Sequence, residues 1–302
     1  MEFGCKVPNN WGIEDPKALF AIGKNAEALG FTSVWVSEHL FNAGHVATRL
    51  GNRPYYEPLT TLAYLAAITT SIRLGTSVLV LPYHHPVNLA KVIATLDVFS
   101  EGRLNLGIGA GLVEEESKAL GTNFAERGPI TDEIIDAMKV LWTQEAPTFQ
   151  SQYRNFSGLG FSPKPSQKPH PPIFVGGTSR PAIRRAARVG DWWHPNAISP
   201  ERIKSGLNYL KIQAEALGRD PTDIQISMSL ELDFPDISGV EHKQYWDRPA
   251  LIGTPHDVIQ KIIAYQDVGV RHIVLATMSN DTNTVNAIHE LFAAEVMPAF
   301  KD

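Results

Sequence analysis

Apolar runs and amphipathic segments alternate along the chain, most clearly between Ser71 and Leu112. The run from Ile72 to Leu81 is almost entirely apolar or small and β-branched, which predicts a parallel strand buried on both faces. Apolar residues recur at helical spacing from Val87 to Phe99, and Leu104 to Ile108 is a second buried run. This pattern predicts one βαβ unit whose two strand ends emerge side by side on one face.

The same alternation predicts eight strands and about eight helices in the whole chain. The expected strands start near positions 2, 33, 73, 103, 173, 191, 224 and 272. Intervals of roughly 30 to 40 residues match simple βα units, so the order predicts a (β/α)8 TIM barrel. An open doubly wound sheet is the alternative, although Gly107 to Leu112 lacks the last glycine of the dinucleotide-binding spacing.

Residues 1–302 are expected to form one barrel domain, because α/β barrels of about 250 residues fold as single units. An insertion is expected near 112–170, with a polar helix from Glu114 and an excursion of hairpin type around 155–158. A longer irregular loop is expected near 232–252, where Tyr245 and Trp246 lie. Residues 41–57 show no clear period, which predicts an elaborated loop.

The composition argues against several classes of partner. The net charge is −5 and no block of lysine and arginine stands out, which disfavours nucleic acids and anionic membranes as partners. A basic and apolar leader is missing at Met1, and no apolar run approaches 18 residues, so a soluble, cytoplasmic protein is expected. Cys5 is the single cysteine, which excludes an intramolecular disulfide. No metal is expected, because the adjacent His84 and His85 point in opposite directions in an extended segment.

In a barrel the active site lies at the carboxyl ends of the strands. The expected ends are rich in glycine, aromatic residues and small hydroxyls, and poor in carboxylate pairs. They are Glu38–His39, Ser77–Val78, Gly109–Gly111, Gly176–Ser179, Trp192–His194, Glu231 and Thr277–Met278. This composition favours a flat aromatic cofactor over metal-assisted hydrolysis, and the sequence contains neither a Gly-x-Ser-x-Gly nor a His-Glu-x-x-His motif.

Several features at these ends have both a functional and a structural interpretation. The alternate glycines from Gly107 to Gly111 either let a ring approach the backbone or allow tight packing. Gly176–Gly177, before a capped helix start, can offer N–H groups to a phosphate or form a plain turn. His39, with Glu38 as its candidate partner, can act as a donor or as an acid or base, or it is structural. Aromatic residues form either core or the wall of an apolar pocket at positions 55, 56, 192, 193 and 246.

Seven runs of the sequence, in order over roughly residues 3–195, resemble the luciferase-like monooxygenase superfamily. They are Gly30–His39, Ile72–Pro82 with His85–Pro86, Ala94–Gly111, Phe124–Gly128, Lys164–Pro165, Pro171–Gly177 and Ala186–Asp191. Within the superfamily the chain most resembles the branch that uses the deazaflavin coenzyme F420. The FMN-using luciferases and alkanesulfonate monooxygenases are less similar. The resemblance therefore implies a barrel with F420 as its cofactor, and FMN is the alternative.

The resemblance also implies where this cofactor binds. Its ring would rest on a bulge at the end of the third strand, where Ser77–Val78 would form a non-proline cis peptide bond. Ala110, Gly111 and His39 would border the ring, and Gly176, Gly177 and Thr178 would meet the cofactor phosphate. The phosphate would thus follow strand five, whereas barrels usually bind phosphate after strands seven and eight.

The expected activity is hydride exchange between the deazaflavin and a small organic substrate. Related sugar-phosphate dehydrogenases carry a glutamate acid where this chain has Leu112, so a more apolar substrate is expected. An FMN-dependent monooxygenase that uses dioxygen and a catalytically silent flavin carrier are the alternatives. Relatives also imply a homodimer, for which the polar and aromatic segment 147–160 gives a weak indication.

Overall fold

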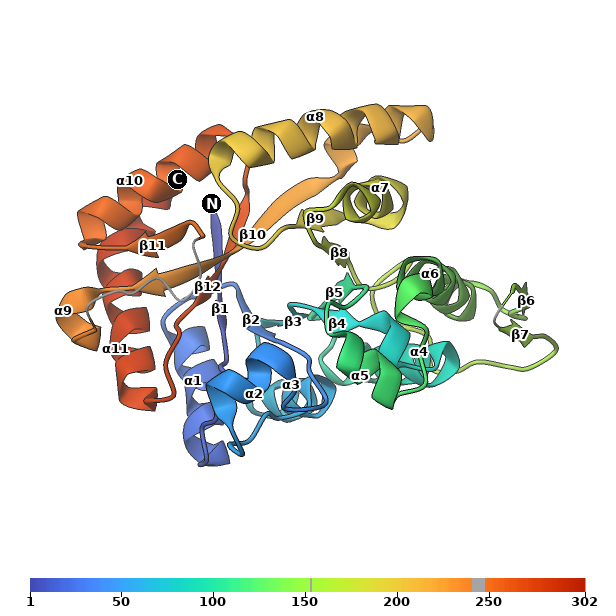
Figure 1. Ribbon diagram of the computed structural model, residues 1–302, viewed down its shortest axis with the longest axis horizontal. Coiled ribbons are helices and arrows are strands. Elements are labelled where there is room, and N and C mark those ends of the chain that lie inside the picture. The colour runs from blue at the N-terminus through green and yellow to red at the C-terminus, as the bar shows by residue number, and fades with distance from the viewer. Residues whose placement is uncertain (153, 241–247, 302) are drawn as a thin grey trace.

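The predicted barrel is present in the computed structural model, which describes the chain except for residues 153, 241–247 and 302. Eight strands pair in parallel around the barrel, and β12 pairs with β1 to close it (Figure 1). They are β1 (Glu2–Lys6), β2 (Ser33–Val36), β3 (Arg73–Thr76), β5 (Leu104–Gly109), β8 (Ile173–Gly176), β9 (Trp192–His194), β10 (Gln225–Asp233) and β12 (His272–Ala276). The (β/α)8 prediction is confirmed, and the doubly wound alternative is wrong.

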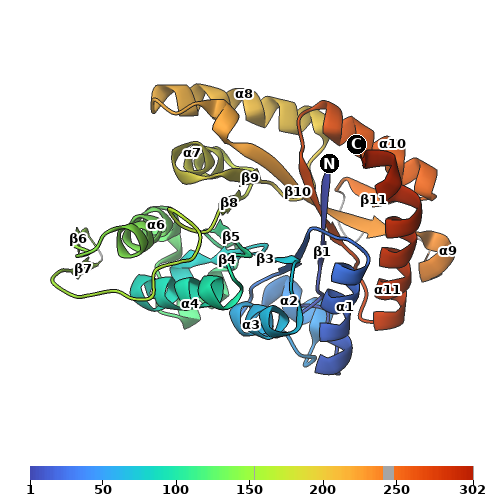
Figure 2. The same ribbon diagram turned by 180° about the vertical axis from the view of Figure 1, so that it is seen from behind.

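A helix follows each barrel strand and covers the outside of the barrel (Figure 2). These helices are α1 (Pro16–Ala28), α3 (Pro58–Ile68), α4 (Pro86–Phe99), α6 (Arg127–Thr143), α7 (Arg180–Val189), α8 (Pro200–Ala216), α10 (Pro255–Asp267) and α11 (Thr282–Leu291). Most of them have a proline at their first or second residue. Proline suits the first turn because the N–H group that it lacks would have no helical acceptor there. Within the part of the chain that the structure describes, none of the helices could cross a membrane.

Three segments differ from the sequence-based expectation. The run 72–81 is not one strand, because β3 stops at Thr76, a bulge follows, and β4 (Leu79–Val80) leads into the 3-10 turn η1 (Leu81–Tyr83). The loop 41–57 contains the short helix α2 (Gly44–Leu50). The segment 232–252 holds the end of β10, α9 (Pro235–Ser238) and β11 (Ala250–Ile252), which pairs with β10. The predicted Tyr245 and Trp246 lie outside the described residues.

The segment 110–172 between β5 and β8 holds more than one helix. The short helix α5 (Glu114–Ala119) and the turn η2 (Phe124–Glu126) precede α6. Beyond α6, β6 (Phe149–Gln150) and β7 (Asn155–Phe156) pair in antiparallel fashion and project away from the barrel (Figures 1 and 2). The helix α5 returns to the barrel mouth, where it supplies a side chain to the site described below.

The barrel interior is filled by aromatic side chains. Trp35 and Phe174 are fully or nearly fully buried, and their rings meet edge to face with centroids 5.0 Å apart. Trp192 stacks on Phe174 at the same centroid distance of 5.0 Å. Gly75 gives Trp35 its space, because a Cβ at this position would lie 2.3 Å from the Trp35 ring. This packed interior forms a solid floor under the carboxyl ends of the strands.

Candidate functional site

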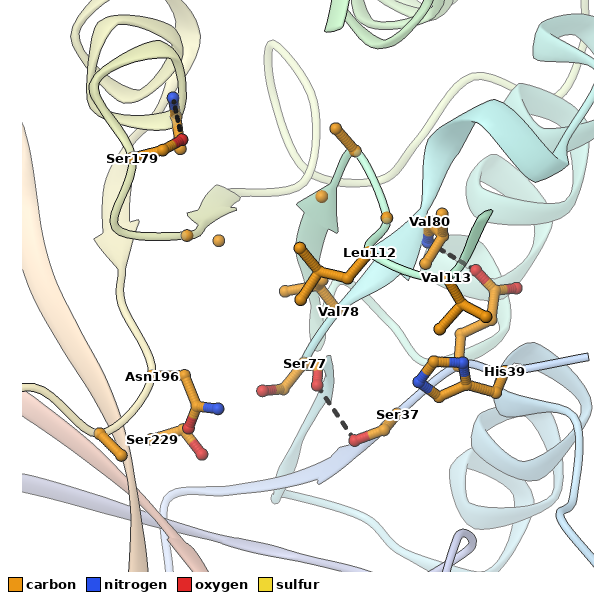
Figure 3. Close-up of a pocket in the computed structure, with 18 of the residues that line it drawn as sticks. Ser37, His39, Ser77, Val78, Val80, Leu112, Val113, Ser179, Asn196 and Ser229 are labelled. Carbon is orange, nitrogen blue, oxygen red and sulfur yellow. Dashed lines mark hydrogen bonds between the residues drawn. The ribbon is translucent and has the colours of Figure 1, made fainter. Parts of the chain in front are cut away.

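A cavity of about 1240 Å³ lies at the carboxyl ends of the barrel strands. Most of the residues predicted for the site line it: Glu38, His39, Ser77, Val78, Ala110, Gly111, Gly176 and Gly177. Thr178 is exposed and is not part of this lining, whereas its neighbour Ser179 is. In Figure 3, Ser77, Val78 and Leu112 lie between Ser179 on one side of the cavity and His39 on the other. The structure therefore brings together strand ends that are far apart in the sequence.

The floor of the cavity is the bulge between β3 and β4. The Ser77–Val78 peptide bond is cis, as the resemblance implied. The Ser37 hydroxyl donates a hydrogen bond of 3.0 Å to the Ser77 carbonyl (Figure 3). The alternate glycines of β5 make room for this bulge: a Cβ at Gly107 would lie 1.7 Å from the Thr76 carbonyl oxygen, and one at Gly109 would lie 2.7 Å from Val78. The packing interpretation of these glycines thus applies at 107 and 109.

One side of the cavity is formed by the turn from β8 into α7. Gly177 has a positive φ of 108°, and the Ser179 hydroxyl caps α7 by accepting from the N–H of Ala182. The N–H groups in a first helical turn have no helical acceptor and carry partial positive charge, which makes such a turn a common anion site. Arg184 of α7 also lines the cavity, and its guanidinium donates to the Tyr209 hydroxyl at 3.2 Å.

The opposite side holds a buried carboxylate paired with His39. Glu116 of α5 is 1% exposed, and its Oε2 lies 2.7 Å from Nδ1 of His39. Tyr83 donates its hydroxyl to the same oxygen, while the N–H groups of Leu40 and Phe41 donate to Oε1. Burial opposes ionisation of Glu116, but the bonds from His39 and the backbone prevail and lower its pKa below the usual value. Because an ionised carboxylate only accepts, His39 donates through Nδ1 and keeps Nε2 for other contacts.

Glu38 does not pair with His39, so that expectation is wrong. Glu38 is 3% exposed as a residue, and its carboxylate accepts from the N–H of Val80 at 2.5 Å and lies 2.8 Å from Nε2 of His84. Burial disfavours a charged His84, but the bond to Glu38 outweighs it and raises the His84 pKa. Glu38 and His39 are adjacent in an extended segment and their side chains diverge. Glu38 therefore connects the end of β2 to β4 and η1, and positions the bulge.

A chain of hydrogen bonds crosses the barrel interior below the bulge. Ser77 Oγ lies 3.0 Å from Nε2 of His194, whose Nδ1 lies 2.8 Å from Ser227 Oγ. Ser227 Oγ also lies 2.7 Å from Nδ1 of His272, whose Nε2 lies 3.0 Å from Ser33 Oγ. Burial, together with His272 in the case of His194, lowers the pKa of both histidines to about 3. Both rings are therefore neutral at pH 7, each with one donor and one acceptor nitrogen.

The aromatic residues flagged in the sequence lie in different parts of the molecule. Tyr55 lines the cavity. Trp193 is fully buried and donates its indole N–H to the Gly177 carbonyl, and Trp192 lies at the other end of the barrel in a second cavity of about 280 Å³. The Tyr56 hydroxyl donates to the carbonyl of Glu14. Of the four flagged aromatic residues that the structure describes, Tyr55 alone lines the cavity at the mouth.

Glu116 and Tyr83 are site residues that the sequence did not single out. Glu116 is one of three consecutive glutamates in a short polar helix, and the local pattern does not distinguish the buried one from its exposed neighbours. It also lies 77 positions from its histidine partner. Only knowledge of the fold, in which α5 returns over the mouth, could have indicated this pair.

The residues present fit a flavin-type cofactor. The backbone at Gly176 and Gly177 forms a cradle that side chains would fill, because a Cβ at either position would lie 2.9 Å from Val78 or Ala182. The bulge offers a surface of small and apolar groups for a flat ring, and the start of α7 offers N–H groups for a phosphate. Within the described residues, no group of three or more acidic, histidine or cysteine side chains could hold a metal ion.

Comparison with known proteins agrees with this geometry. The family model "Luciferase-like monooxygenase" matches residues 1–234. The chain belongs to this luciferase-like monooxygenase family. It is 34% identical over 212 residues to an FMNH(2)-dependent dimethylsulfone monooxygenase of Pseudomonas putida. The aligned region covers 69% of this chain and 56% of that enzyme. A dimethylsulfone monooxygenase of Pseudomonas fluorescens is 26% identical, covering 97% of this chain and 88% of that enzyme.

Two solved structures share the whole barrel. The monooxygenase RslO1 from Streptomyces bottropensis superposes with a TM-score of 0.84 at 24% identity, over 100% of both chains. An F420-dependent secondary alcohol dehydrogenase superposes with a TM-score of 0.83 at 20% identity, over 100% of this chain and 99% of that one. At these identities the likeness to the two structures establishes the fold alone.

Proposed function

We propose that this luciferase-like protein is an F420-dependent oxidoreductase that exchanges a hydride with a small, fairly apolar organic substrate. The arrangement around the cavity supports the proposal more than any single residue does. The Ser77–Val78 bulge lies between a helix start suited to phosphate and a histidine backed by a buried carboxylate. Such a cavity of about 1240 Å³ has room for a tricyclic cofactor and a substrate together.

Each part of the cavity has a distinct task in this proposal. The first turn of α7 with Gly176 and Gly177 would hold the phosphate, and Val78 with Ala110 and Gly111 would support the ring. The bound deazaflavin supplies the hydride chemistry. His39 would take the hydroxyl proton of an alcohol substrate on Nε2, or return it to a carbonyl oxygen, while Glu116 holds the ring through Nδ1. Leu112, which is 87% exposed, would cover the substrate with an apolar surface.

A second candidate is an FMN-dependent monooxygenase that uses dioxygen. The similarity to the two dimethylsulfone monooxygenases, which are named for reduced FMN, favours this candidate. The same cradle and bulge would accept the isoalloxazine ring and the phosphate of FMN. The two candidates differ in the cofactor retained and in the use of oxygen, so binding measurements separate them.

The decisive experiment is equilibrium titration of the purified protein with F420 and with FMN, followed by fluorescence. We expect F420 to bind at least about tenfold more tightly, and substrate to reduce it without oxygen consumption. Tighter binding of FMN with substrate-dependent oxygen uptake would establish the monooxygenase instead. Tight binding of either cofactor without turnover on a panel of alcohols and ketones would indicate a carrier protein.

A matched pair of variants tests the phosphate cradle. Gly177→Ala should weaken cofactor binding about tenfold or more, because Gly177 has a positive φ and a Cβ there would crowd Ala182. Gly160→Ala is the control, since nothing lies within 4 Å of a Cβ at that position. Equal affinities in the two variants would contradict phosphate binding at this turn.

A further inference from the structure

Within the described part of the chain, two buried polar atoms beside the proposed cofactor site have no hydrogen-bond partner. They are the hydroxyl oxygen of Tyr55 and Nε of Arg49, and both residues line the large cavity. Among the described residues, Nε of Arg49 donates no hydrogen bond, and Cζ of its guanidinium lies 4.8 Å from the centre of the Trp11 ring. Buried polar groups are nearly always paired, because an unpaired one loses its bonds to water without compensation.

Among the residues that the structure describes, no ion pair compensates the positive charge of Arg49. Lys6 lies nearby with only a 3.4 Å contact to the Ser37 hydroxyl, and burial together with Arg49 lowers its pKa to about 8. Neither Lys6 nor Arg49 forms an ion pair within the described part of the chain. Two nearby carboxylates are already engaged, Glu38 with His84 and Glu116 with His39. An anion would compensate the charge of a cationic, partly buried pocket of this kind.

We propose that Arg49 and Tyr55 bind the anionic head group of the substrate, a carboxylate or a sulfonate. The proposal rests on the proposed function and narrows its substrate to an amphiphilic organic acid with one anionic head and an apolar remainder. A guanidinium presents a planar fork that matches a carboxylate or sulfonate, and a phenol adds one further donor. The apolar remainder would extend over Val78 toward Leu112, which lie in the same cavity.

The proposed subsite at Arg49 and Tyr55 lies close to His39, the proposed acid or base. The rings of Tyr55 and His39 lie 5.8 Å apart, centre to centre, in an edge-to-face arrangement. An anion on Tyr55 would thus hold the adjoining carbon atoms close to His39. Burial raises the Tyr55 pKa above its usual value although Arg49 opposes the rise, so the phenol stays a donor at neutral pH.

Binding of small probe anions to the full-length protein tests the proposal without turnover. We expect benzoate and benzenesulfonate to bind at least about tenfold more tightly than benzyl alcohol, which has the same apolar ring and no charge. Arg49→Gln should abolish this preference, and Arg49→Lys should restore part of it. Arg184→Gln changes the α7 side of the same cavity and should leave the affinity for benzoate unchanged. A loss of benzoate affinity in this variant would instead indicate binding near the phosphate turn.

Tyr55→Phe adds a readout that a merely structural residue would not give. Removing a buried hydroxyl without a partner should leave the melting temperature unchanged or raise it, and yet weaken benzoate binding severalfold. Affinities that are equal in the wild type and in Arg49→Gln would overturn the proposal, as would absence of binding or equal affinity for benzyl alcohol. Failure of F420 and FMN binding in the wild type would instead refute the proposed function, because the probe measurements need no cofactor.

Discussion

At the scale of single residues, the pairing of His39 with Glu116 determines how the site can act. We expect His39→Ala to lower turnover about 10²-fold to 10⁴-fold with little change in cofactor affinity, because a positioned acid or base contributes this much. His85→Ala is the matched control, since His85 is exposed and lies outside the cavity. Steady-state rates and cofactor titrations on both variants check the prediction, and unchanged turnover in His39→Ala would remove the residue from the mechanism.

Glu116→Gln tests the role of the partner of His39 without changing the volume of its side chain. The amide keeps the shape of the side chain but loses the charge, and it must satisfy four donors from His39, Tyr83, Leu40 and Phe41. We expect turnover of this variant to fall about tenfold or more. Glu116→Asp, which keeps the charge on a shorter side chain, should restore only part of the turnover. A change in turnover no larger than that of Glu115→Gln, its exposed neighbour, would show that Glu116 is structural.

At the scale of elements, the fit between β2 and β3 depends on a missing side chain. Gly75→Ala would place a Cβ 2.3 Å from the Trp35 ring, so we expect a loss of about 1–3 kcal/mol in the free energy of unfolding. The double variant Gly75→Ala, Trp35→Leu should lose less than the two single variants together, because the smaller side chain frees the space. Urea unfolding of the four proteins measures this coupling, and strict additivity would contradict it.

The same elements show what the sequence could and could not predict. Apolar periodicity predicted the strands and helices well, because burial of one face is encoded within each segment. It did not predict the break after Thr76, since Ser77 and Val78 are as apolar or small as their neighbours, and only the resemblance indicated the bulge there. The predicted strand ends placed His39 at the site, but they did not indicate that Glu116 approaches it from α5. Such partners depend on tertiary arrangement that no local pattern carries.

At the scale of the whole molecule, the barrel carries neutral histidines in its interior and behind it. Burial lowers the pKa of His194 and His272 to about 3, and that of His289 to about 4, from the usual 6.5. Unfolding exposes these rings, and below pH 6.5 the unfolded chain binds protons that the folded chain does not. Their contribution to stability is therefore complete above pH 6.5 and is lost as the pH falls toward 4 and then 3. The raised pKa of His84 acts in the opposite direction, but for one group only.

We therefore expect the free energy of unfolding to fall by an amount of order 1 kcal/mol per pH unit for each of these three histidines below pH 6.5. Urea unfolding at half-unit steps from pH 7.5 to about 4.5 measures this slope. His272→Gln should reduce this slope by the contribution of one histidine, even if the variant is less stable at every pH. His85→Gln should leave the slope unchanged, because His85 is exposed. A flat profile in the wild type would mean that the interior histidines accept protons in the folded barrel, and that the Ser–His chain below the bulge is open to solvent.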